Sequence, residues 1–450
     1  MSKSDKYLGL AARFVKDRFG SPSTLRYYRQ EWWIWSQGRY RVQSEDDLTG
    51  MMVLWLHEEE EDSRLAAVRE LRNHIRVLDC VSVASTVDMP LYVNVDHYDD
   101  TSNFLAFQDC LIDLDVLASG PIRPIRLRPD SNWFSAVVMS YNYEPEATCP
   151  QFHVFLDKVL PDKPSQDVLQ EWFGYCLTKD NSFRKLMILF GEARTGKSTL
   201  SNILEAVIGP ENRSAVPLEC FWNRFSPHEM VGKLVNFCGD CNQIDRLAEG
   251  VIKRFTGGDT ILVDRKYKDP VSLKMTAKII VATNVFPQVK DPSEALWDRF
   301  IVVPMNVRIQ DHEIDLSLLN SEKTSWPLRW ELPGIFNWAI EGLKRLKRQG
   351  KFTTSQVFEQ AKTTVRHENC SLSQFVDERC NPDPSCSETT SRFMNEYICF
   401  CDSMNLKAMN SSQVGRTLRK LIPGMEKKRM GSRYEQQMHY VGLQIIVPRS

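Results

Sequence analysis

Residues 191–198 carry the side-chain types and the spacing that suit the binding of a phosphate chain. They read Gly-Glu-Ala-Arg-Thr-Gly-Lys-Ser and fit the pattern G-x-x-x-x-G-K-[ST] at every fixed position. Glycines let backbone N–H groups turn toward phosphate oxygens, and the start of a helix adds a favourable dipole. Lys197 would neutralise the β- and γ-phosphates of ATP, and the Ser198 hydroxyl would bind Mg²⁺. The predicted ATP-binding residues are Gly191, Glu192, Ala193, Arg194, Thr195, Gly196, Lys197, Ser198 and Thr199.

The sequence on both sides of this loop predicts the elements that must hold it. The apolar run at residues 186–190 predicts a buried strand, and residues 197–207 predict a helix. A strand-to-helix turn with an exposed lysine is the bland alternative. The full motif in this context favours the phosphate-binding loop.

Such a loop also needs an acidic side chain at the end of a neighbouring strand to hold Mg²⁺. Asp240 follows the apolar run at residues 234–238, so we predict that Ser198 and Asp240 are the magnesium ligands. A rival interpretation makes Cys238 and Cys241 half of a zinc site, because C-x-x-C is a ligand spacing. No second pair with suitable spacing follows, which counts against zinc.

A short basic segment lies between two strand-like runs at residues 261–263 and 271–273. It contains Arg265, Lys266, Tyr267 and Lys268, a combination in which cations can meet phosphates and the ring can pack on a base or sugar. These four residues are candidate DNA-binding residues. A solvated hairpin tip is the alternative, and composition alone favours it.

The final segment of the chain is strongly basic. Residues 407–450 contain nine Lys or Arg and two Glu, a local charge of +7 that suits nucleic acid. A helix capped by Ser411 or Ser412, followed by strands within residues 434–447, predicts a winged helix. The DNA-binding candidates here are Arg416, Lys427, Lys428 and Arg429. A solvated capping module is the alternative, since basic faces are often only solvated.

A weaker candidate site is the pair Asp113 and Asp115, with Asp96, Asp99 and Asp100 upstream. Alternation along a strand puts Asp113 and Asp115 on one face, where they could hold two metals for nucleotide polymerisation. The preceding chain is short and poor in further motifs for a primase domain, so priming activity is disfavoured.

The remaining pattern predicts how the chain is divided. Strands alternate with helices over residues 184–307, which predicts an α/β core with a mostly parallel sheet. Helices are expected at residues 62–75, 152–160, 165–177 and 326–346, the last stopped by Gly350, and strands at residues 91–95, 111–117, 234–238, 278–282 and 301–304. A polar loop at residues 381–387 is expected to mark a boundary. We predict an accessory domain at 1–148, a P-loop domain at 149–350 (helical lead-in 149–183, core 184–310) and a winged-helix module at 351–450.

Further motifs occur in a fixed order after the loop. Residues 253–260 (KRFTGGDT) lead to residues 264–270 (DRKYKDP), then to the strand at 278–283 with Asn284, and then to residues 297–300 (WDRF). Together with the P-loop, they resemble the superfamily 3 helicase domain of the phage, plasmid and poxvirus primase-helicase family, an AAA+ ATPase. The resemblance covers most of residues 145–310 and extends weakly to residues 104–115, 143–150 and 411–443.

The resemblance implies a role for each part. Asp240 would be the Walker B acid, with Gly239 where many NTPases have a first carboxylate, so the group that polarises the attacking water stays open. Asn284 would be sensor 1, and Arg299 would be an arginine finger that reaches the ATP of the next subunit. Spacing alone would make Asn284 a turn former and Arg299 a surface ion-pair partner. In such rings the basic hairpin projects into the central pore, where Lys266 and Lys268 would grip DNA.

The expected activity is that of an ATP-dependent DNA helicase from a phage, plasmid or other mobile element. The resemblance implies a ring, with six subunits in the family, that moves 3′ to 5′ on single-stranded and forked DNA beside a separate primase or polymerase. Three alternatives stay open: an ATP-switched replication initiator that binds origin DNA, a bifunctional primase-helicase, and a P-loop kinase for a small molecule.

Composition limits the class of protein. The chain has 450 residues, 57 basic and 58 acidic side chains and a formal net charge of -1, which excludes a histone-like basic chain. No apolar run is long enough to span a bilayer, and the first twenty residues lack the apolar stretch of a signal peptide. Twelve cysteines without a disulfide framework indicate reduced thiols. We expect a cytoplasmic protein that does not use a membrane.

Overall fold

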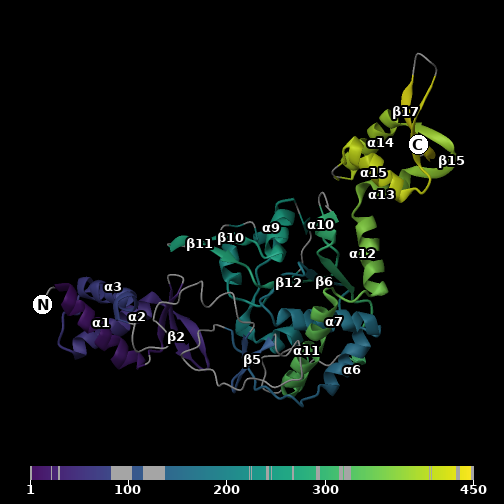
Figure 1. Cartoon of the computed structure of the whole chain (residues 1–450). Coiled ribbons are helices and arrows are strands. Elements are labelled where there is room, and N and C mark those ends of the chain that lie inside the picture. Colours follow the sequence, from purple (N-terminus) through teal and green to yellow (C-terminus); the bar gives the residue numbers. More distant parts are fainter. Residues whose placement is uncertain are drawn as a thin grey trace.

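The computed structural model shows an N-terminal unit, a central α/β core and a C-terminal module in chain order (Figure 1). It describes residues 3–21, 23–28, 31–82, 104–114, 137–221, 223, 225–239, 243–244, 246–265, 268–289, 294–313, 318, 326–404, 406, 408–431 and 436–446.

The N-terminal unit packs three helices on one face of a small antiparallel sheet. Its elements are α1 (Lys3–Phe19), β1 (Leu25–Tyr28), β2 (Glu31–Ser36), β3 (Arg39–Gln43), α2 (Glu45–Glu58) and α3 (Leu65–Ser82), with the strands in the order β1-β2-β3. The helix predicted at 62–75 is present as α3. Arg39 and Arg41 form ion pairs with Glu211 of the core, so this unit contacts the core just beyond the P-loop helix.

A two-stranded sheet follows this unit in the sequence and packs against the core. It consists of β4 (Phe104–Ala106) and β5 (Leu111–Asp113). The strand predicted at 111–117 is therefore present, but it ends at Asp113, and Leu114 is helical. The strand predicted at 91–95 lies outside the described residues. Met139 donates its backbone N–H to Ala106, and the Tyr141 hydroxyl donates to the Val207 carbonyl in the P-loop helix.

The core is a five-stranded parallel sheet in the order β14-β6-β12-β8-β7. Its strands are β6 (Leu186–Phe190), β7 (Arg213–Ser214), β8 (Val235–Cys238), β12 (Lys278–Thr283) and β14 (Phe300–Pro304). The central strands are apolar along almost their whole length because the sheet is covered on both faces. The strands predicted at 234–238, 278–282 and 301–304 are each within one residue of these bounds.

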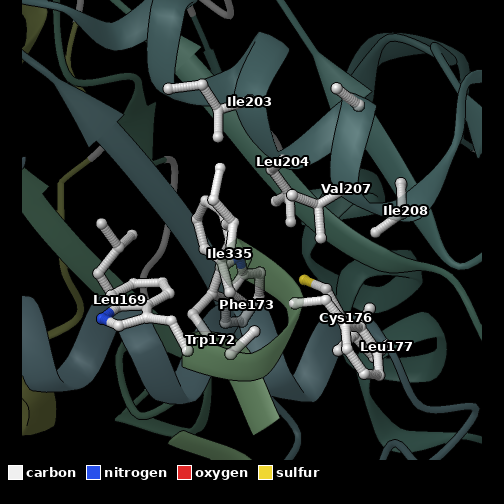
Figure 2. Close-up of a cluster of buried hydrophobic side chains, with 14 of the residues drawn as sticks. Leu169, Trp172, Phe173, Cys176, Leu177, Ile203, Leu204, Val207, Ile208 and Ile335 are labelled. Atoms are coloured by element: carbon white, nitrogen blue, oxygen red, sulfur yellow. The ribbon is translucent and has the colours of Figure 1, made fainter. Parts of the chain in front are cut away.

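Helices from distant parts of the chain cover the sheet. These are α6 (Pro150–Val159), α7 (Lys163–Cys176), α8 (Lys197–Ile208) and α11 (Leu332–Gln349). Helix α11 is ended by Gly350 in a left-handed conformation, as predicted. Figure 2 shows side chains of α7, α8 and α11 meeting in one buried cluster. Helices α7 and α11 approach closely at Gly342, where a Cβ would lie 2.2 Å from the Gln170 carbonyl oxygen.

A lysine is buried at the start of β12. Lys278 donates from Nζ to the carbonyls of Thr178 (2.7 Å) and Thr276 (2.9 Å), and it lies 4.6 Å from the centre of the Tyr175 ring. Burial lowers the pKa of Lys278 to about 8, because a charged amine is disfavoured away from water.

Shorter elements complete the core. They are η1 (Pro210–Asn212), η2 (Leu218–Cys220), η3 (Ser226–Met230), β9 (Gln243–Ile244), α9 (Arg246–Gly257), β10 (Thr260–Arg265), β11 (Lys268–Lys274), β13 (Gln288–Val289), α10 (Glu294–Trp297), η4 (Asp311–Glu313) and η6 (Pro327–Glu331). Helix α12 (Gln356–Glu368) packs against β14 and leads to the C-terminal module.

The C-terminal module has the order of a winged helix. Its elements are α13 (Ser371–Arg379), β15 (Cys380–Thr389), α14 (Thr390–Ser403), α15 (Ser411–Leu421), β16 (Glu426–Met430) and β17 (Gln437–Ile445), with the strands in the order β15-β17-β16. They enclose a separate hydrophobic core.

Two details predicted for this module are wrong. Residues 381–387 lie within β15 and are not a boundary loop. Strand β15 tolerates Pro382 and Pro384 because it is an edge strand whose pairing is irregular between Asp383 and Ser387. The cap of α15 is Asn410, not Ser411 or Ser412, since Asn410 and Gln413 form a reciprocal capping box.

The predicted fold class is confirmed: a mixed α/β unit, a P-loop core with a parallel sheet, and a winged-helix module. The cysteines whose state the structure gives are free thiols. Within the described ranges, no helix combines the length and the apolar character needed to cross a membrane.

Candidate nucleotide site and nucleic-acid surfaces

The predicted phosphate-binding loop lies between β6 and α8, at the carboxyl end of the sheet. Gly191 packs so closely that a Cβ there would lie 2.2 Å from the Met305 carbonyl oxygen at the end of β14. Arg194 and Gly196 have φ values of 65° and 90°, which turn the backbone back on itself. The N-cap of α8 is Gly196, which has no side chain to cap the helix, so its first N–H groups are suited to an anion.

Lys197 is held inside the loop. Its Nζ donates to the carbonyls of Gly191 (2.7 Å) and Glu192 (2.6 Å), and Lys197 is 8% exposed. Thr195 is also buried and its hydroxyl donates to the Glu192 carbonyl at 2.9 Å, whereas Ser198 is exposed beside them. Glu192, Ala193 and Arg194 form the exposed rim of the loop, and Thr199 is buried in α8.

Asn284 lies next to this loop. Strand β12 pairs with β6 so that Thr283 is level with Phe190, and the Gly191 N–H donates to the Thr283 carbonyl at 3.3 Å. Asn284 follows directly and is exposed. Asn284, the residue predicted as sensor 1, is therefore at the same carboxyl end of the sheet as the P-loop.

Strand β8 lies on the other side of β12 and ends at Cys238, also at the carboxyl end of the sheet. Asp240 lies outside the described residues, so its role as a magnesium ligand stays a prediction. Cys238 is buried, and its Sγ lies 3.3 Å from the Val216 carbonyl oxygen and 3.2 Å from the Asn236 amide. Among the described residues, no group of three His, Cys, Asp or Glu side chains is arranged to hold a metal.

Arg299 lies at the opposite end of the sheet, where the parallel strands begin. Its carbonyl accepts the N–H of Leu186 at 2.9 Å, so it marks the start of β6, whereas the P-loop follows the end of β6. Its guanidinium donates from Nε to the Thr256 hydroxyl (3.0 Å) and from NH1 to the Ala295 carbonyl (2.5 Å). Partial burial, and then the positive charge of Arg184, lower the pKa of Arg299.

The predicted hairpin is formed by β10 and β11, which pair from Thr260 with Lys274 to Arg265 with Lys268. Val263 is buried while Leu262 is 66% exposed, so one face of the hairpin packs on the core and the other meets solvent. Lys266 and Tyr267 lie outside the described residues, as do the side chains of Arg265 and Lys268. Their contact with DNA stays a prediction.

The basic residues predicted in the winged helix are on two elements. Arg416 is exposed on α15, and Lys428 and Arg429 are exposed on β16. Lys427 lies over the Tyr440 ring at 5.8 Å, and Lys428 forms an ion pair with Glu426. The structure therefore brings Lys427, Lys428 and Arg429 onto one strand of the wing hairpin, apart from Arg416.

Asp113 ends β5 and is partly exposed. Asp115 and the aspartates at 96, 99 and 100 lie outside the described residues, so the two-metal hypothesis stays a prediction.

Two contacts had no counterpart in the sequence interpretation. The hydroxyl of Thr256 accepts a hydrogen bond from Arg299, and Glu294 of α10 binds Arg366 and Lys420. Nothing in local spacing identifies such partners, because they come from separate elements.

Two family models match parts of the chain. A family described as "Family of unknown function (DUF5906)" matches residues 189–299, from the end of β6 to Arg299. The "RFX DNA-binding domain" matches residues 370–447, the winged-helix module.

Viral proteins are similar to this chain in sequence. A protein provisionally named helicase L207/L206, from Acanthamoeba polyphaga mimivirus, is 27% identical over 207 residues, which are 44% of this chain and 21% of that protein. Proteins with the same kind of name from Invertebrate iridescent virus 6 (27% over 191 residues; 36% of this chain and 18% of that protein) and Frog virus 3, isolate Goorha (22% over 286 residues; 55% and 27%), are also similar.

The chain thus spans about a fifth to a quarter of the length of these curated relatives. An apo structure of the NrS-1 C-terminal region covers 96% of this chain and 99% of its own, with a TM-score of 0.46 and 12% identity. In sequence, this chain is related to viral proteins that carry helicase names.

Proposed function

We propose that the chain is the motor part of an ATP-dependent DNA helicase that acts as a ring. The observation that carries the proposal is the arrangement of the sheet: β12, which is followed directly by Asn284, lies between the P-loop strand β6 and the strand β8 that precedes Asp240. This strand order suits an AAA+ core, in which a polar side chain between the P-loop and the Walker B strand positions the attacking water. The cofactors would be ATP and Mg²⁺.

The position of Arg299 supports an assembly of several subunits. Since β6 has five residues at about 3.3 Å each, Arg299 and its own P-loop are about 16 Å apart along the strand. An arginine so far from its own nucleotide would act on that of a neighbour, in a head-to-tail contact that closes into a ring. A hexamer is the ring size expected from the resemblance.

DNA is the proposed substrate for two reasons. The winged-helix module matches a family described as a DNA-binding domain, and it presents cations on α15 and β16. The viral relatives carry helicase names. Single-stranded and forked DNA would pass the β10–β11 hairpin, with 3′ to 5′ movement driven by hydrolysis and a separate primase or polymerase as partner.

ATP turnover with and without single-stranded DNA, measured beside light scattering, tests this proposal. We expect ATP-dependent assembly, DNA-stimulated hydrolysis and displacement of a strand from forked DNA. The Lys197→Ala variant should lose hydrolysis because the β- and γ-phosphates lose their cation. Wild-type ATP turnover that is indifferent to DNA, with phosphate transferred to a metabolite, would instead indicate a small-molecule kinase.

The match of the module to a DNA-binding domain also favours a second function, an ATP-switched initiator at a replication origin. An initiator of this kind would assemble on duplex DNA in ATP and leave forked DNA paired. The strand-displacement assay therefore separates the two functions.

A further inference from the structure

Three charged side chains join the winged-helix module to the core segment that precedes Arg299. The carboxylate of Glu294 accepts a hydrogen bond from Lys420 Nζ at 3.2 Å and another from the guanidinium of Arg366. Glu294 belongs to α10, Arg366 to α12 and Lys420 to α15. Both cations lower the pKa of Glu294, so the carboxylate is ionised at neutral pH.

Lys420 belongs to a basic face of α15. Arg416, Arg419 and Lys420 are exposed and lie three and four residues apart, so they share one side of the helix. Val414 and Leu418 are buried on the other side. Three cations in such a row suit the phosphates of a nucleic-acid backbone. The carboxylate of Glu294 accepts a hydrogen bond from Lys420, one of these three cations.

The end of α12 makes a second contact with the same core segment. The Asn369 side chain accepts the N–H of Val289 at 3.0 Å. Val289 follows Asn284 by five residues, and Glu294 precedes Arg299 by five. Helix α12 and the module thus both contact the stretch of chain that connects the two candidate ATPase residues.

We propose that Lys420 exchanges Glu294 of the core for a DNA phosphate, so that DNA binding releases the winged-helix module from α10. This inference rests on the DNA-binding function proposed above. The side chains of Glu294 and Lys420 are 58% and 71% exposed. Exposed ion pairs of this kind shift an equilibrium by about two- to five-fold, which a row of phosphates can overcome.

The affinity of the full chain for a short fluorescent duplex tests the exchange. Glu294→Gln should tighten DNA binding by about two- to five-fold, because Lys420 no longer has a competing carboxylate. Glu368→Gln is the matched control: it removes one exposed carboxylate from the nearby α12 and changes the net charge equally. In a Lys420→Gln background, Glu294→Gln should have no more effect than the control. Equal tightening by Glu368→Gln, or an undiminished effect in the Lys420→Gln background, would overturn the proposal.

Hydrogen exchange at the amides of α10 distinguishes this inference from the proposed function. Without DNA, Lys420→Gln should speed exchange in α10 relative to wild type, and Glu368→Gln should leave it unchanged. Adding duplex to the wild type should also speed it, because the module leaves α10. Unchanged exchange in Lys420→Gln, or slower exchange with bound duplex, would refute the docking. A wild-type chain that binds no duplex would instead refute the proposed DNA binding, while the DNA-free comparison still tests the contact.

Discussion

Replacement of Arg299 by alanine separates its effect on catalysis from its effect on the fold. The change removes hydrogen bonds to the Thr256 hydroxyl and to the Ala295 carbonyl. Thr256 keeps its own donation to the Ile252 carbonyl at 2.7 Å, so no buried hydroxyl is left without a partner. We expect a loss of about 1 kcal/mol in the free energy of unfolding, small beside a typical total of about 5–15 kcal/mol.

The expected loss of ATPase activity is much larger. An arginine that stabilises the charge of phosphoryl transfer contributes about a thousand-fold or more to turnover. Because Arg299 and its own P-loop are at opposite ends of β6, the arginine of one subunit should serve the nucleotide of the next. Nucleotide binding to the Arg299→Ala variant, measured by calorimetry, should stay close to that of the wild type.

A mixture of two inactive variants tests this directly. Lys197→Ala lacks the P-loop cation but keeps its arginine, and Arg299→Ala has the opposite defect. In a random equal mixture, about one interface in four joins an intact loop to an intact arginine, because each variant occurs with a frequency of one half. Hydrolysis should therefore reappear in the mixture at a fraction of the wild-type rate.

Lack of recovery would refute the reasoning, provided that both variants fold and co-assemble in ATP. Retained turnover in the Arg299→Ala variant alone would refute it equally. Unmixed samples of each variant at the same total concentration are the controls.

Three other predictions follow from the described contacts and from the sequence. Lys278 has a pKa of about 8 in the fold and about 10.5 when unfolded, so between these pH values the unfolded chain binds more protons than the folded chain. The free energy of unfolding should therefore rise with pH over this range, by up to about 1.4 kcal/mol per pH unit. Lys278→Met should remove this rise in chemical denaturation, and an unchanged slope would contradict the assignment. Gly342→Ala should lower stability by about 1–3 kcal/mol in thermal unfolding because its Cβ meets a backbone carbonyl, whereas Gly50→Ala, in an open position of α2, should raise stability slightly. Lys266→Ala combined with Lys268→Ala should leave basal ATPase but abolish unwinding and DNA stimulation; unchanged unwinding would show that the hairpin does not grip the strand.

The sequence predicts the core strands well because each is a short apolar run between turn residues. Residues 186–190 match β6 at both ends for this reason. Residues 381–387 failed because prolines and polar side chains indicate a loop, whereas an edge strand needs only part of its backbone for pairing. The order of the strands depends on contacts between distant segments, which no local pattern encodes.

The candidate site was predictable to the extent that it is a motif. The loop from Gly191 to Ser198 is contiguous, so its motif can be recognised directly. The resemblance supplied Asn284 and Arg299, which the structure places at opposite ends of the parallel strands. The partners of Arg299 and Glu294 were not predictable, since they are single side chains from separate helices. Their pairing depends on how those helices pack.

Strand β6 has one further consequence for the proposed ring. Its first residue is bonded to Arg299, and its last residue leads into the phosphate-binding loop. A strand in the middle of a parallel sheet is stiff, so the two ends cannot shift independently. In such a ring, a displacement of Arg299 at one nucleotide would be transmitted along β6 to the phosphate-binding loop at the next nucleotide. Neighbouring hydrolysis events would then occur in sequence without any hinge inside the subunit.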